Sequence, residues 1–447
     1  MTELPRKAVT RTARLAALPL GYAGRTAVGV GRRLGGAPAE AVVTEMQQRT
    51  AEQLFRTLGD LKGGAMKFGQ ALSVFEAALP EELAGPYREQ LTKLQDSAPP
   101  MSVTTVRVVL ARELGADWRD QLIELDPEPA ASASLGQVHR GRWHDGRDVA
   151  IKIQYPGAEQ AFASDLRQLA RVARTFGSLI PGIDVKPLIK ELQDRAAEEL
   201  DYRLEAEAQA GFAAAYTEDP DHVVPGVVAH TQRVLVSEWM DSTGSLAQLI
   251  KDGTQEQRDH YGTLYAGFLF GGPERTGMLH ADPHPGNFRL LPLPDDAPEG
   301  TLGGMGVVDF GAVARLAERG FPPAMGRLMR AAARDDYDGV LSGLREEGFI
   351  KPRIRIEAAE LREFLHPFVE PAATNTFRFT RAWMRSQFER LSDPRNPEYT
   401  LNLKVNLPPS YLLIHRTWLG AIGVLSQLEA EIPFRGLLEE HLPGFAD

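Results

Sequence analysis

A lysine near the end of an apolar strand is the feature that most constrains the fold of this chain. The sequence predicts a strand over Asp148–Gln154, which follows a strand over Gln137–Trp143 with an Asp-Gly hairpin signal in the gap. Further strands are predicted over Val223–Val228 and Arg233–Trp239. An ammonium group is costly to bury unless it meets an anion. Lys152 therefore predicts an anion beside a small sheet.

Helical patterns surround that sheet and divide the chain into four parts. The 447 residues are 43% apolar and 25% charged, which is ordinary for a globular protein. We predict a basic segment over 1–40, a helical extension over 41–125, a small sheet with inserted helices over 126–240 and a mainly helical unit over 241–447. The predicted fold class is α+β.

The composition excludes several classes of function. The net charge of −10 argues against a dedicated nucleic-acid binder, and the lack of cysteine excludes disulfides, cysteine-ligated zinc and thiol catalysis. We find no run of about 18 uncharged apolar residues that would predict a transmembrane helix. These features favour a cytoplasmic protein, and they carry no information on its oligomeric state.

The N-terminal segment offers one route to a membrane surface. Residues 1–40 carry seven basic side chains and two acidic ones. An amphipathic basic helix there would lie on an anionic membrane, which would make the protein peripheral. The alternative is a solvated arm, and the sequence leaves both open.

Two motifs follow the lysine strand in the order that protein kinases use. The V-A-I-K lysine of those enzymes, here Lys152, holds the α- and β-phosphates of ATP. His280, Asp282 and Asn287 have the H-x-D-x₄-N spacing of a kinase catalytic loop, whose aspartate orients or deprotonates the attacking group. Asp309 opens a D-F-G motif and would bind Mg²⁺ together with Asn287. Each motif alone is weak, but their order is a strong signal for Mg²⁺-ATP binding.

The phosphate loop expected before the lysine strand is altered. Ala131 and Ala133 replace the first two glycines of the G-x-G-x-x-G-x-V frame, whereas Gly136 and Val138 keep the pattern. Alanine restricts φ, so we expect a stiffer loop. The predicted nucleotide-binding residues are Ala131, Ser132, Ala133, Ser134, Gly136, Val138, Lys152 and Glu238.

Lys152 needs a carboxylate to orient it. Glu199 and Glu205 belong to a helical pattern over 185–216, but they are six residues apart and do not share a face of a regular helix. Either one could face Lys152. No A-P-E motif follows Asp309, which argues against a kinase that docks protein substrates.

The chain resembles the UbiB/AarF/ADCK family of atypical kinases, which includes the coenzyme Q biosynthesis kinases. Four features carry the resemblance, although Ser132 stands where many members of the family have alanine. They are K-x-G-Q at Lys67–Gln70, an alanine-rich loop over Ala131–His139, an E-x-D motif with a further glutamate over Glu199–Glu205, and the catalytic-loop and D-F-G motifs.

The resemblance implies a bilobal, protein-kinase-like fold with an N-terminal helical K-x-G-Q extension across the active site. Lys67 and Gln70 would face the nucleotide pocket and exclude protein substrates, and Glu199 and Glu205 would orient the lysine or take part in gating. The implied cofactors are ATP and Mg²⁺. The implied activity is that of an atypical kinase or ATPase acting on a small or lipid-like molecule, such as a quinone-precursor lipid, or supporting isoprenoid-quinone biosynthesis. The phosphoryl acceptor, including water, is left open.

Two other functions remain open from the residues themselves. A metallohydrolase could use His280, Asp282 and His284 as metal ligands, although this leaves the lysine strand unexplained. In a non-catalytic scaffold, nucleotide binding would order a surface for a lipid or a partner protein, because every motif can serve binding alone.

Overall fold

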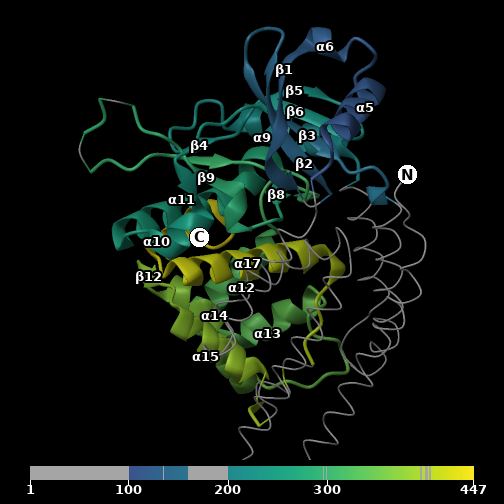
Figure 1. The fold of residues 1–447 in the computed structure, drawn as a ribbon. Coiled ribbons are helices and arrows are strands. Elements are labelled where there is room, and N and C mark those ends of the chain that lie inside the picture. Colours follow the sequence, from purple (N-terminus) through teal and green to yellow (C-terminus); the bar gives the residue numbers. More distant parts are fainter. Residues whose placement is uncertain are drawn as a thin grey trace, which may run out of the picture.

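The computed structural model describes residues 100–446, except for 134, 160–199, 295, 299, 393–394, 398–400 and 402–403. Figure 1 shows a small sheet at one end of the described residues and a larger helical body at the other. Several predictions fall outside the described residues. They are the basic segment 1–40, the K-x-G-Q motif with Lys67 and Gln70, Ser134 and Glu199.

Five antiparallel strands form the sheet. Their order is β1 (Leu122–Ala133), β2 (Gly136–Trp143), β3 (Asp148–Gln154), β6 (Val234–Glu238) and β5 (Val227–His230). Side chains alternate along β3, so Val149, Ile151 and Ile153 are fully buried on one face, whereas Lys152 belongs to the other. The period of two therefore turns the lysine away from the apolar core of the sheet.

Two helices before the sheet belong to its core. Val106 and Leu110 of α5 (Val103–Glu113) and Trp118 of α6 (Trp118–Gln121) are buried in one cluster with the apolar residues of β3. The sheet unit thus begins before the predicted boundary at 126. The sequence does not predict strand β1, because prolines interrupt the alternation of apolar and polar residues and the pairing of β1 with β2 is irregular.

The strand predicted over Val223–Val228 is in fact two strands in different sheets. β4 (His222–Val223) pairs with β10 (Met305–Val307), and β5 pairs with β6. Pro225 has no N–H to donate to a ladder, and the N–H of Gly226 donates instead to Glu238 Oε2 at 3.2 Å. These two residues separate the strands.

Helix α9 (Tyr202–Ala215) connects the sheet to the helical body. Asp201 caps it by accepting a hydrogen bond from the backbone of the first turn. Tyr202 and Ala206 pack on Leu235 of β6, whereas Phe212, further along the helix, belongs to the core of the body. Helix α9 therefore packs against both the sheet and the helical body, and it links their positions.

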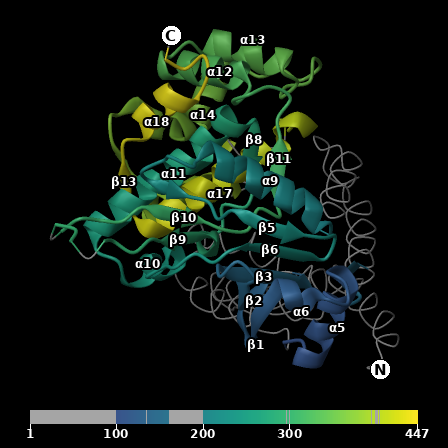
Figure 2. The same ribbon diagram turned by 90° about the horizontal axis from the view of Figure 1, so that it is seen from above.

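Helices α11 (Gln255–Thr276) and α17 (Leu412–Leu428) form the centre of the body (Figure 2). Tyr265 and Phe268 of α11 share the main core with Val424 and Leu425 of α17. No helix in the described part of the chain is long and apolar enough to span a membrane. The other elements are α10 (Leu246–Asp252), α12 (Pro323–Ala333), α13 (Tyr337–Glu346), α14 (Ala358–Ala373), α15 (Arg381–Ser392), α18 (Phe434–His441), β12 (Phe377–Arg378), β13 (Glu431–Ile432) and the 3₁₀ turn η3 (Pro409–Tyr411).

Short strands hold the two loops that carry the predicted catalytic residues. One sheet has the order β4, β10, β9 (Phe288–Leu290) and β7 (Gly244–Ser245), and β8 (Met278–His280) pairs with β11 (Val313–Arg315). The loop 281–287, which ends in the 3₁₀ turn η2 (Pro285–Asn287), runs from β8 to β9. The loop 308–312 runs from β10 to β11. Because the strands pair, both loops reach the same edge of the body.

Candidate active site

A cavity of about 600 Å³ lies between the five-stranded sheet and the two loops of the helical body. Its volume is within the usual range for a small-molecule site. Residues far apart in the sequence meet in its wall. The predicted site residues among them are Ala131, Ser132, Ala133, Val138, Lys152, Glu205, Glu238, Asn287 and Asp309.

Lys152 sits between two carboxylates. Its Nζ lies 2.6 Å from Glu205 Oε1 and 3.1 Å from Asp309 Oδ1, and its side chain is 14% exposed. Burial alone would lower the pKa of Lys152, but the carboxylates of Asp309 and Glu205 outweigh it and raise this pKa well above its usual value. The lysine is therefore a fixed positive charge on the cavity wall.

Of the two glutamates that the sequence offered as partners of Lys152, Glu205 meets it in the described residues. It lies in the first turn of α9, and its side chain is 5% exposed. The sequence left Glu199 and Glu205 as equal candidates, and Glu199 is outside the described residues. Glu205 is positioned by the start of α9 at Tyr202, which turns this face of the first turn toward β3.

The alanine segment forms a strand hairpin above the cavity. The paired residues are Ala131 with Val138, Ser132 with Gln137, and Ala133 with Gly136. A Cβ on Gly136 would lie 2.1 Å from the carbonyl oxygen of Ile153, so this close approach of β2 to β3 requires glycine. The backbone of the two alanines is held in a ladder and does not form an open glycine-rich loop.

Asp309 adopts a left-handed backbone conformation, with φ of 67°. His280 Nε2 donates to its carbonyl oxygen at 3.0 Å, and its Oδ1 accepts from the N–H of Gly311 at 3.1 Å. A non-glycine residue in this region costs free energy that the surroundings must supply. These two hydrogen bonds hold the conformation in which the carboxylate faces Lys152.

Asn287 links the two loops. The N–H of Val308 donates to the Asn287 carbonyl oxygen at 2.9 Å, and Asn287 Nδ2 donates to the Asp282 carbonyl oxygen at 3.3 Å. Asn287 lines the cavity, whereas Asp282, which is also buried, is not part of its wall. The predicted metal ligand is thus in the cavity and the predicted catalytic aspartate lies beside it in the same loop.

Glu238 turns its carboxylate toward protein groups. Its Oε1 accepts from Arg147 Nη1 at 2.9 Å, and its Oε2 accepts from the N–H of Gly226. The residue still lines the cavity at the end of β6. Its side chain therefore fixes the β5–β6 edge of the site.

Gln209 is a wall residue that sequence reasoning missed. Its Nε2 donates to the Pro225 carbonyl oxygen at 2.8 Å and lies 2.9 Å from Ser237 Oγ, and the side chain is 4% exposed. The signal was available, because Gln209 follows Glu205 by four residues and so shares its helical face. It ties α9 to β6 and helps to hold Glu205 in place.

The oxygen donors of the cavity fit Mg²⁺, which prefers carboxylate and amide oxygens. The Asp309 carboxylate and the Asn287 side chain both line it, and the bond from Asn287 Nδ2 leaves the amide oxygen as the available donor atom. The residues of the alternative metal site do not converge. Nε2 of His280 is used by Asp309, His284 Nδ1 accepts from the N–H of Gly286, and the described residues hold no group of three or more His, Cys, Asp or Glu side chains arranged to bind a metal.

Comparison with known proteins identifies the family of this chain. The family model described as the ABC1 atypical kinase-like domain matches residues 93–343, which is more than half of the chain. The chain belongs to this family. It is the UbiB/AarF/ADCK family that the motifs indicated, and the kinase-like α+β fold is that of its matched domain.

Curated relatives of this ABC1 chain include atypical kinase COQ8B, mitochondrial, of Rattus norvegicus, which is 34% identical over 214 residues, or 46% of this chain and 40% of that protein. Probable protein kinase UbiB of Xylella fastidiosa is 27% identical over 400 residues, covering 87% of this chain and 68% of that protein. The chain spans 40%, 43% and 50% of the length of the first three curated relatives.

Among solved structures, the complex of Rv3197 with erythromycin from Mycobacterium tuberculosis is similar to this chain. The two are 42% identical, with a TM-score of 0.68, and the match covers 92% of this chain and 100% of that chain. The similarity therefore extends well beyond the 93–343 segment that the family model matches.

Proposed function

We propose that this ABC1 protein binds Mg²⁺-ATP and acts as an atypical kinase or ATPase. The observation that carries the proposal is Lys152, held at 2.6 Å from Glu205 and 3.1 Å from Asp309 in the wall of a nucleotide-sized cavity. An ammonium group fixed beside a metal-binding carboxylate suits a polyphosphate with its counter-ion.

Each residue has a distinct role in this proposal. Lys152 pairs with the phosphates, and Glu205 orients it. Asp309 and Asn287 would hold Mg²⁺, which supplies positive charge to neutralise the phosphates when it is bound. Asp282 would orient the hydroxyl group of the acceptor or of water and receive its proton. The strand hairpin with Ala131 and Ala133 would cover the phosphates more rigidly than a glycine-rich loop does.

We further propose that the acceptor is a small or lipid-like molecule, in support of isoprenoid-quinone biosynthesis, rather than a protein. No A-P-E motif follows Asp309. The similar solved structure is a complex with erythromycin, a small molecule. An anionic membrane surface and a quinone-precursor lipid are the partners proposed for this activity. A cytoplasmic protein that contacts the membrane peripherally through residues 1–40 would reach both the membrane surface and the lipid.

Thermal shift with Mg²⁺-ATP tests nucleotide binding. Lys152→Ala and Asp309→Asn should each lose most of the ATP-dependent rise in melting temperature, because a ligand that binds the folded state stabilises it by an amount that grows with the ratio of ligand concentration to dissociation constant. Lys251→Ala, on the exposed surface of α10, is the matched control and should keep the full shift. An undiminished shift in both site variants would rule out the assignment.

A non-catalytic scaffold is the second candidate, because the residues that line the cavity can serve nucleotide binding alone. Turnover in the presence of phenolic quinone precursors and anionic liposomes separates the two functions. If the protein is an enzyme, Asp282→Asn should keep nucleotide affinity and lose most ATP hydrolysis or transfer. A scaffold would bind ATP and show no turnover that depends on Asp282.

A further inference from the structure

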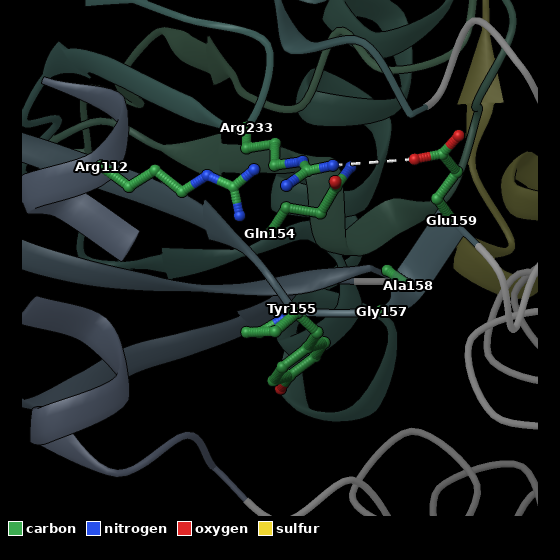
Figure 3. A pocket seen from close by; sticks show the side chains of 8 residues that line it. Arg112, Gln154, Tyr155, Gly157, Ala158, Glu159 and Arg233 are labelled. Atoms are coloured by element: carbon green, nitrogen blue, oxygen red, sulfur yellow. Dashed lines mark ion pairs between the residues drawn. The ribbon is translucent and has the colours of Figure 1, made fainter. Parts of the chain in front are cut away.

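A second cavity, of about 290 Å³, lies beyond the carboxyl end of β3 (Figure 3). It shares no lining residue with the nucleotide cavity. Its wall combines the end of α5, the end of β3 with the residues that follow it, and the start of β6. The lining residues are Arg112, Gln154, Tyr155, Pro156, Gly157, Ala158, Glu159 and Arg233.

Two arginine side chains line this cavity. Figure 3 shows the Arg112 side chain entering it from the end of α5, and the Arg233 side chain extending toward Glu159. Among the residues that the structure describes, Arg233 has one ion pair, with Glu159 at 3.7 Å, and Arg112 has none. The Glu159 side chain is 58% exposed, and an exposed pair at this distance contributes little. Within the described part of the chain, the positive charges of the two arginines that line this cavity are therefore only weakly compensated.

Thr231 links the two segments that carry the arginines. Its Oγ1 donates to Glu113 Oε2 at 2.9 Å and accepts from the N–H of Arg233 at 3.2 Å. Glu113 follows Arg112 directly, so one hydroxyl group ties together the segments that carry the two guanidinium groups. The position of Arg112 in the last turn of α5 also suits the helix dipole. The dipole does not account for Arg233, which lines the cavity from the position just before β6.

Tyr155 and Gln154 form the floor of the cavity. They are hydrogen-bonded to the alanine hairpin and to the residue chain that leads into α9, which both shape the nucleotide site. The N–H of Tyr155 donates to the Leu135 carbonyl oxygen at 2.8 Å, at the turn of the alanine hairpin. Gln154, which is 4% exposed, donates through Nε2 to the Leu200 carbonyl oxygen at 3.2 Å, just before α9 and Glu205. A ligand that moves this floor would act on the hairpin and on α9 together.

We propose that Arg112 and Arg233 bind the phosphate group of a small phosphate monoester, and that this binding alters nucleotide affinity at the neighbouring site. Paired guanidinium groups match phosphate through bidentate, charge-assisted hydrogen bonds. The cavity has about half the volume of the nucleotide cavity, which suits a phosphate or a phosphorylated headgroup rather than a second nucleotide. Phosphate binding needs only the geometry described here, whereas the effect on nucleotide affinity rests on the proposed function.

Two sources of the phosphate are distinguished by two binding assays on the full chain. Calorimetry with inorganic phosphate and with glycerol 3-phosphate measures free ligands. Flotation with phosphatidylcholine vesicles containing phosphatidic acid measures a lipid headgroup, and vesicles with phosphatidylglycerol control for general surface charge. Binding in either assay supports the site, provided that it depends on the two arginines.

The double variant Arg112→Gln/Arg233→Gln should weaken phosphate binding at least tenfold, because it removes the charge-assisted bonds. Arg107→Gln, an exposed arginine on the same helix, should leave it unchanged. Glu159→Gln should tighten binding severalfold, since it removes the competing carboxylate. A gain of affinity cannot result from misfolding, so this variant keeps the test sharp if the double variant is unstable.

Three outcomes would overturn the proposal. The wild-type protein could bind neither free phosphate nor vesicles, or the double variant could bind as tightly as the wild type. Loss of phosphate binding in Lys152→Ala, with full binding in the double variant, would instead assign the phosphate to the nucleotide cavity. For the coupling, saturating phosphate should change the ATP-dependent thermal shift of the wild type and leave that of the double variant unaltered. An unchanged shift in the wild type would refute the regulatory role while leaving nucleotide binding intact.

Discussion

At the scale of single residues, the candidate site depends on the charge balance around Lys152. Two carboxylates raise its pKa well above the ordinary value against the opposing effect of burial. A raised lysine pKa contributes stability that is complete below the unfolded-state value and is lost only as the pH rises through the folded-state value. The charge on Lys152 is therefore constant across the neutral range.

Glu205→Gln should loosen Lys152 and lower its pKa, because one of the two compensating charges is removed. We expect a loss of about 1–3 kcal/mol in the free energy of unfolding, since Lys152 keeps Asp309 as a partner. The ATP-dependent thermal shift should be smaller than in the wild type. As the pH is raised, this shift should also begin to decrease at a lower pH than in the wild type, because Lys152 loses its proton earlier. Glu207→Gln, two residues further on and 61% exposed, should cost no more than about 0.5 kcal/mol and leave the pH profile unchanged.

At the scale of secondary-structure elements, helix α17 directly supports the loop 281–287, which carries the predicted catalytic aspartate. A Cβ on Gly420 would lie 2.3 Å from Pro283 Cγ, so the helix and the loop approach as closely as glycine allows. On the other side, the Tyr265 hydroxyl of α11 donates to the Pro283 carbonyl oxygen at 2.7 Å. Two helices of the main core thus set the position of the residue next to Asp282.

Gly420→Ala should displace the loop and destabilise the protein by about 1–3 kcal/mol, as overpacked cores do. Turnover should fall more than nucleotide affinity, because Asp282 moves while Lys152 does not. Gly436→Ala in α18 is the matched control, since a Cβ there meets nothing within 4 Å. The control should leave the free energy of unfolding unchanged or raise it by up to about 1 kcal/mol, because alanine is favoured over glycine within a helix. Urea unfolding measures the stability of each variant, and an ATP turnover assay measures its activity. If Gly420→Ala and Gly436→Ala have the same stability and the same turnover, the contact between Gly420 and Pro283 does not position the loop.

At the scale of the whole molecule, the cavity wall joins the N-terminal sheet to the helical body, and the family resemblance adds the K-x-G-Q extension as a third contributor. Lys67 and Gln70 lie outside the described residues, so their gating role stays a prediction. The alanine hairpin, by contrast, is part of the described wall. If both restrict the same cavity, their effects on the nucleotide must be coupled.

Ala133→Gly should free the hairpin, change nucleotide preference and allow self-phosphorylation, because glycine restores backbone freedom. Lys67→Ala should alter the same properties. The double variant should be non-additive in ATP affinity by more than about 0.5 kcal/mol, as is usual for residues that share a site. Titration of each variant with ATP, together with a phosphorylation assay, measures this coupling. Small and strictly additive effects would show that the extension does not reach the cavity.

The sequence alone determined the family and the strand that carries Lys152. A period of two is a local property, so β3 and the orientation of its lysine could be read directly, and the spacing of the H-x-D-x₄-N and D-F-G motifs is likewise local. Strand β1 and the break at Pro225 were not predictable in this way, because prolines and irregular pairing erase the periodic signal.

Only the tertiary structure decided which groups meet. Glu205 bonds Lys152 because α9 begins at Tyr202 and packs its first turn on β6, a contact that no helical pattern contains. Arg112 and Arg233 line one cavity because Thr231 joins the end of α5 to the turn before β6. Local spacing fixes the face of an element on which a side chain lies, and long-range packing fixes the partner that this face meets.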